Sequence, residues 1–213
     1  YKDMDAFDKK TVLAKLFWNI TDNQELRLSY TANRSDNILY PSSKMDAIYD
    51  DSDIFNAEYI AKDLGRYSKE LYIQLYQSEV EHPMSTVYRN VSLKDPMNPG
   101  NPNEMTHALS TKMQGAKIKN SFDLDNHTLT AGVDYSLRNW DGGYYKNGNA
   151  HKVPISIDDV DTENIAFFLK DEIKMDKFVL DLGLRYDDTT ITPGHNIVKP
   201  KPMSQEDRDY SEL

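Results

Sequence analysis

The sequence predicts an all-β protein, a section of about eight strands from an antiparallel transmembrane β-barrel. Three observations lead to this prediction. Apolar and polar residues alternate along successive segments, short turns alternate with long irregular segments, and aromatic side chains lie mostly near the ends of the apolar faces. A period of two gives a strand one apolar and one polar face, which a helical period does not.

The alternating segments, in chain order, are residues 12–20, 26–32, 54–62, 69–80, 116–124, 129–137, 165–173 and 178–186. Short turns near Asp22, Gly65, Asn126 and Asp176 join them in pairs, and residues of these types favour tight turns. The last pair, within residues 163–187, has the clearest alternation and predicts a long-armed hairpin. In its first strand Asp171 and Phe168 do not fit the alternation.

Three long segments lose the period of two and separate the predicted hairpins. They span residues 34–52, 81–108 and 140–162, and we interpret all three as loops because prolines, asparagines and glycines gather in them. Short turns at one end and long loops at the other are typical of outer-membrane barrels. Strands of about 10 residues, rising roughly 3.3 Å per residue and tilted, cover the apolar band of a membrane.

The two faces of the strands differ in kind. Charged side chains on the polar face are predicted to face a barrel lumen: Arg27, Glu58, Asp134, Arg138, Asp181 and Arg185. Aromatic residues lie on the apolar face, as in interfacial girdles: Trp18, Phe55, Tyr59, Phe122, Tyr135, Phe178 and Tyr186. The alternative is a soluble or small-barrel β protein with an adhesive or structural role, such as a β-sandwich with one solvated face, because it shares the alternation.

Composition narrows the class of protein. The chain is 38% hydrophobic with a net charge of −10, yet it carries 14 tyrosines and 7 phenylalanines, which favours a folded protein. It contains no apolar run long enough for a transmembrane helix. The absence of cysteine excludes disulfides and thiolate chemistry. The acidic balance argues against a nucleic-acid partner.

No catalytic motif is present. The HExxH spacing, a glycine-rich phosphate loop and a GxSxG element are all missing, so we predict no enzyme activity and no cofactor. Two acidic clusters offer oxygen ligands of the kind that calcium prefers: Asp50, Asp51 and Asp53, and Asp158, Asp159 and Asp161. Neither has the EF-hand spacing, so we interpret both as solvated loop charge and predict no metal site.

The last hairpin also resembles a known family. Phe168, Asp171 and Glu172 precede its turn, and the run Gly-Leu-Arg-Tyr-Asp at residues 183–187 follows it. This arrangement resembles the barrel of TonB-dependent outer-membrane receptors, and residues 127–140 are similar to an upstream strand of the same barrels. The resemblance implies a barrel of about 22 strands around an N-terminal plug, in the outer membrane of a Gram-negative bacterium.

What the resemblance implies about function is import of ferric siderophores, haem, cobalamin or other scarce nutrients, with energy from TonB acting through the plug. We expect a ferric siderophore as the ligand, with haem or another metal complex as the alternative, and membrane lipid around the wall. Residues 1–213 are expected to belong entirely to the barrel domain, as a middle section. The plug, the TonB box and the remaining strands are expected to lie outside this sequence.

The predicted loop tips carry the candidate ligand-binding residues, which combine aromatic surface with positive charge: Tyr88, Arg89, Trp140, Tyr144, Tyr145 and Lys146. An aromatic belt at the membrane edge is the alternative for Trp140 and Tyr144. Four histidines in predicted loops suit haem or metal capture, although solvated loop histidines are the favoured interpretation: His82, His107, His151 and His195. His127 lies at a short turn, and no role is predicted for it.

Overall fold

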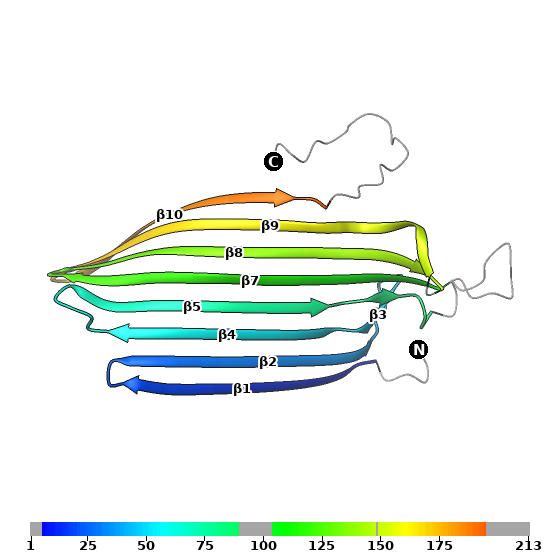
Figure 1. Cartoon of the computed structure of the whole chain (residues 1–213), viewed down its shortest axis with the longest axis horizontal. Coiled ribbons are helices and arrows are strands. Elements are labelled where there is room, and N and C mark those ends of the chain that lie inside the picture. Colours follow the sequence, from blue (N-terminus) through cyan, green and yellow to red (C-terminus); the bar gives the residue numbers. More distant parts are fainter. Residues whose placement is uncertain (1–5, 90–103, 148, 195–213) are drawn as a thin grey trace, which may run out of the picture.

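The computed structural model describes residues 6–89, 104–147 and 149–194. These residues form one antiparallel sheet whose long strands lie side by side (Figure 1). The sheet is a meander, because each long strand pairs with the next long strand along the chain. The predicted all-β antiparallel fold is confirmed.

The long strands are β1 (Asp8–Thr21), β2 (Gln24–Ile38), β4 (Asp51–Lys62), β5 (Ser68–Glu81), β7 (Met105–Leu124), β8 (His127–Lys146), β9 (Asn149–Met175) and β10 (Phe178–Thr192). They correspond one to one with the predicted alternating segments. Two short strands, β3 (Asp46–Tyr49) and β6 (Met84–Ser85), were not predicted. β3 and β6 pair with each other, and they also pair with β2 and β7, respectively.

The tight turns after β1, β4, β7 and β9 gather at one end of the sheet, on the left of Figure 1. We call this the turn end and the opposite end the loop end. At the turn between β7 and β8, Asp125 has a left-handed φ of 57°, a conformation that aspartate tolerates and two-residue hairpins need. The predicted gathering of the four short turns at one end is therefore confirmed, whereas β8 and β9 are joined at the loop end by a short connection between Lys146 and Asn149.

The prediction of long loops was wrong in extent. β8 continues to Lys146 and β9 begins at Asn149, so most of residues 140–162 is paired strand. β2 likewise runs to Ile38, and β7 begins at Met105. Beyond the apolar band both faces of a hairpin are polar, so no alternation marks these strands in the sequence. Backbone hydrogen bonds to the neighbouring strands hold them extended.

The apolar face is uncovered. Directly opposite residues share a face, and Leu184 lies opposite Leu169 while Tyr186 lies opposite Phe167. Phe178 is 72% and Leu184 is 73% exposed, although burying such a side chain away from water is favourable by about 1.5–3 kcal/mol. The described residues form a single layer, so the sandwich alternative is wrong, and the exposed face fits the lipid-facing side of a barrel wall.

Candidate functional site

One cross-strand row on the polar face builds the candidate site. Tyr72 on β5 lies opposite Lys119 on β7, Lys119 opposite Gly132 on β8, and Gly132 opposite Phe168 on β9. Arg185 on β10 completes the row opposite Phe168. Register alone therefore gathers two cations and two aromatic rings from across four strands, with a glycine from a fifth strand in the middle of the row.

Gly132 makes room for Phe168. A Cβ atom at residue 132 would lie 2.3 Å from Cζ of Phe168 and 2.7 Å from the backbone oxygen of Ile118. The phenyl ring therefore occupies the space that a side chain on β8 would fill. This explains why Phe168 departs from the alternation of its strand, because its ring belongs to the polar face.

The next row adds charge. Lys117 lies opposite Asp134, with Nζ 3.1 Å from Oδ2, and Arg185 places Nη1 3.7 Å from the same oxygen. Arg185 also binds Asp187 at 2.8 Å. Lys119 contacts an aromatic ring, with Nζ 4.7 Å from the centroid of Tyr72. Within the described part of the chain, Lys119 has no carboxylate in ion-pair range, so it carries positive charge that a ligand can use.

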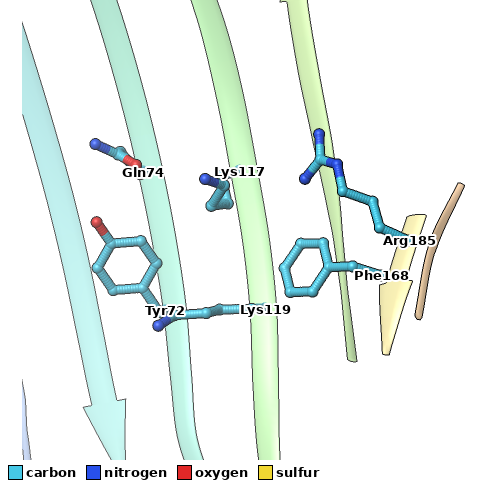
Figure 2. Close-up of a pocket in the computed structure, with 6 residues that line it drawn as sticks. All are labelled: Tyr72, Gln74, Lys117, Lys119, Phe168 and Arg185. Atoms are coloured by element: carbon cyan, nitrogen blue, oxygen red, sulfur yellow. The ribbon is translucent and has the colours of Figure 1, made fainter. Parts of the chain in front are cut away.

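These side chains surround an open depression of about 470 Å³, which we call the polar-face groove; its lining is Tyr72, Gln74, Lys117, Lys119, Phe168 and Arg185. Figure 2 shows Lys119 extending towards Tyr72, with Phe168 on the opposite side of the lysines from Tyr72. The volume is that of ordinary small-molecule sites. Cations beside ring faces suit an anionic, ring-bearing ligand.

The residues predicted to face a lumen lie on the polar face, and most have charged partners. Arg27 binds Glu25 at 2.8 Å and approaches Glu58 at 3.9 Å. Asp181 forms an ion pair with Lys170, with Nζ of Lys170 3.0 Å from Oδ1 of Asp181. Arg185 and Asp187 form a charge pair with each other, in which Nε of Arg185 donates to Oδ2 of Asp187 at 2.9 Å.

Two of the predicted ligand residues have partners within the protein. Arg89 donates hydrogen bonds to both carboxylate oxygens of Asp46 and to the backbone oxygen of Tyr40. Asp46 is completely buried. Tyr88 donates a hydrogen bond of 2.8 Å to Asn37. Both predicted residues therefore hold the loop-end connections in place, and a ligand would have to compete with these contacts.

The other four predicted ligand residues lie on β8, where the strand extends past the apolar band, and strand alternation divides them. Trp140, Tyr144 and Lys146 share the polar face, whereas Tyr145 points to the other side. The guanidinium of Arg138 lies 3.9 Å from the centre of the Trp140 ring. Arg138 and Trp140 thus form one cation–π pair, although the sequence placed them in different categories.

Tyr144 contacts His107, which the sequence analysis interpreted as a solvated loop histidine. The His107 ring stacks on Tyr144 at 4.2 Å with an angle of 14°, and its Nε2 lies 2.5 Å from Oγ of Ser156. Burial lowers the pKa of His107 below its ordinary value, which favours the neutral imidazole. The structure therefore assigns His107 a defined environment, and the interpretation of it as a solvated loop residue was wrong.

The remaining histidines and acidic clusters have varied surroundings. His127, for which no role was predicted, places Nδ1 2.7 Å from Oδ2 of Asp171 on the apolar face. Nδ1 of His82 lies 3.6 Å from Oδ2 of Asp50. The side chain of His151 and all of His195 lie outside the described residues.

The acidic clusters contact protein groups. Asp53 binds Arg34 at 2.9 Å, and Asn139 donates hydrogen bonds to both Asp159 and Asp161. Among the described residues, no group of three or more histidine, aspartate or glutamate side chains is arranged to hold a metal ion. The described residues also include no helix capable of crossing a membrane.

Comparison with known proteins decides the family. A model of the TonB dependent receptor-like β-barrel matches residues 5–213. The chain belongs to the TonB-dependent receptor family. Members of this family are transporters in the outer membrane of Gram-negative bacteria. The family resemblance predicted from the last hairpin is confirmed.

Solved structures agree with the TonB-dependent receptor barrel. The structure of "Copper transporter OprC" superposes with a TM-score of 0.74 at 16% sequence identity, over 88% of this chain. That identity supports the fold alone. The chain spans 29% of the OprC chain. No curated protein matches the sequence.

The polar-face groove was missed as a site by sequence reasoning. Lys117 and Lys119 lie on the polar face, but nothing local in the sequence indicated that Tyr72, Phe168 and Arg185 lie beside them. The available signals were Phe168, which does not fit the alternation, and Gly132, a glycine within a strand.

Proposed function

We propose that the chain forms part of the wall of an outer-membrane TonB-dependent transporter that imports a ferric siderophore. The plug and the remaining strands would lie outside these 213 residues. The polar face would be the lumen and the loop end would be extracellular, because long connections of such barrels face outward. The plug would receive the pull of TonB and release the bound complex into the periplasm.

The polar-face groove carries the ligand part of this proposal. Lys119, Lys117 and Arg185 are cationic, and Tyr72 and Phe168 offer ring faces. Many ferric siderophores are anionic and ring-bearing, so they suit cationic contact combined with stacking. Two of the cations share Asp134, so Lys119 supplies the positive charge that is not already neutralised.

Binding to the full-length receptor in detergent tests the proposal. A screen of ferric catecholates, ferric hydroxamates and haem should find tight binding of an anionic ferric siderophore. Lys119→Gln should weaken that binding about tenfold, the effect of losing roughly 1.4 kcal/mol of charge-assisted contact, while Lys119→Arg keeps most of it. Lys69→Gln is the matched control, because Lys69 pairs with Asp123 at the turn end.

Other results would count against a siderophore. Binding of haem alone, lost in His151→Ala, would favour the haem alternative. Siderophore binding that is equal in Lys119→Gln and Lys69→Gln would remove the groove from the ligand path. A receptor that is monodisperse without detergent would contradict the membrane assignment.

A further inference from the structure

The register at the loop end brings two methionines beside His107. β6 continues the line of β5 along β7: Glu81 lies opposite Ser110, and three residues later Met84 lies opposite His107. Directly opposite residues of antiparallel strands share a face and have Cβ atoms about 4.5–5.5 Å apart. Met105 lies two positions from His107 on β7, so its side chain has the same orientation.

We propose that Met84, His107 and Met105 form a binding site for a soft monovalent metal ion, Cu(I), with Ag(I) as its analogue. We call these residues the thioether–imidazole site. Thioethers are soft ligands that select Cu(I), and imidazole also binds copper. The site lies on the polar face. The inference that an entering solute would meet it there rests on the proposed transporter function.

The surroundings of His107 prepare it as a ligand. Metal-binding histidines usually donate the N–H of the second ring nitrogen to a nearby acceptor, which fixes the tautomer and the ring orientation. Ser156 can accept this hydrogen bond from Nε2, which leaves the Nδ1 lone pair for the metal. Stacking on Tyr144 holds the plane of the ring.

The charge nearby favours a monovalent ion over a divalent one. Lys146 lies directly opposite Met105, so its ammonium group repels cations at the site. This repulsion doubles for a divalent ion. The three proposed side chains bring no carboxylate, whereas hard cations such as calcium and magnesium need oxygen ligands. Half-buried side chains at all three positions leave the site open to solvent.

The test measures Cu(I) affinity of the full-length receptor in detergent, with ascorbate as reductant and bicinchoninate as competing chelator. We expect one Cu(I) per receptor, at least tenfold weaker binding in Met84→Leu, Met105→Leu and His107→Gln, and tighter binding in Lys146→Gln. Leucine conserves the volume of methionine, so these variants keep the fold. Ag(I) titration by calorimetry should give the same order.

Two controls separate the site from general metal uptake. Met113→Leu removes a methionine from the same face of β7, farther from His107, and His82→Gln removes a histidine that already faces Asp50. Both should keep the affinity of the unmodified receptor. Absence of Cu(I) binding, or binding that is unchanged in Met84→Leu and His107→Gln, would overturn the proposal.

Siderophore binding in the same variants keeps the two proposals apart. Met84→Leu should lose Cu(I) and keep siderophore affinity, whereas Lys119→Gln should lose siderophore affinity and keep Cu(I). If Met84→Leu keeps Cu(I) binding, the thioether–imidazole site is wrong. If Lys119→Gln keeps siderophore affinity, the groove has no part in siderophore binding.

Discussion

Arg89 and Asp46 form a two-point ion pair at the loop end, with Nη2 2.5 Å from Oδ1 and Nε 2.6 Å from Oδ2. Asp46 is completely buried and also accepts a hydrogen bond from the backbone nitrogen of Tyr40. The guanidinium reaches the backbone oxygen of Tyr40 as well. This pair therefore joins β3, and through Tyr40 the segment before it, to the segment after β6.

Breaking this pair should loosen the loop end without unfolding the barrel wall. Arg89→Met removes the guanidinium that binds both oxygens of a buried carboxylate, and breaking a buried ion pair typically costs about 3–5 kcal/mol. Hydrogen exchange of the amides in β3 and β6 should accelerate, while amides in β8 and β9 stay protected. Arg66→Met, at an exposed turn, is the control and should change neither.

The double variant distinguishes charge from packing. Asp46→Leu combined with Arg89→Met removes both charges, so it should be less destabilised than Arg89→Met alone. Equal exchange rates in the single and double variants would show that the lost contacts of Arg89, and not the buried charge of Asp46, dominate.

Gly132 should be far less tolerant of a side chain than Gly183. Alanine at residue 132 meets the Phe168 ring and the Ile118 carbonyl, whereas a Cβ at residue 183 has no heavy atom within 4 Å. We expect Gly132→Ala to cost about 1–3 kcal/mol through overpacking. Gly183→Ala should stay within about 0.5 kcal/mol. The temperature at which the folded band disappears in heat-modifiability gels measures both.

Phe168 provides the rescue for that variant. Phe168→Leu shortens the side chain that the new methyl group would strike, so it should recover part of the loss in Gly132→Ala. If Phe168→Leu does not recover stability, the clash with the Ile118 carbonyl, and not the clash with the Phe168 ring, causes most of the loss.

Adjacent residues of β10 should respond oppositely to charge. Leu182 lies on the apolar face and Gly183 on the polar face. Arginine on the lipid side of a barrel costs about 2–4 kcal/mol near the middle of the membrane. Leu182→Arg should therefore reduce the fraction that folds into lipid vesicles, and Gly183→Arg should leave it close to that of the unmodified protein. The reverse order would mean that the faces are assigned wrongly.

Removing His127 should destabilise the barrel more than removing its partner Asp171. Oδ2 of Asp171 contacts His127, while its other carboxylate oxygen is buried without a hydrogen-bond partner among the described residues. His127→Leu should destabilise the barrel by about 1–3 kcal/mol, because it leaves the carboxylate unpaired. Asp171→Leu leaves a histidine whose side chain is 41% exposed and can be hydrated, so its effect should be smaller. The double variant should recover most of the loss, as measured by urea unfolding in vesicles.

The sequence determined the wall of this protein. In barrels of this family, membrane lipid and a polar interior lie on opposite sides of each strand, so residues such as Leu180, Leu182 and Leu184 are expected to alternate with polar ones. That period is readable without a structure. The tight turns and the family motif at residues 183–187 were readable for the same reason, because both are local in the chain.

Only the tertiary structure decided which side chains meet. Tyr72 and Arg185 reach one groove through the register of the strands between them, and register also places Met84 opposite His107. Beyond the apolar band, water surrounds both faces of a hairpin, so no hydrophobic period distinguishes strand from loop. There the extended strands depend on backbone hydrogen bonds and on pairs such as Asp46 with Arg89, which join positions far apart in the sequence.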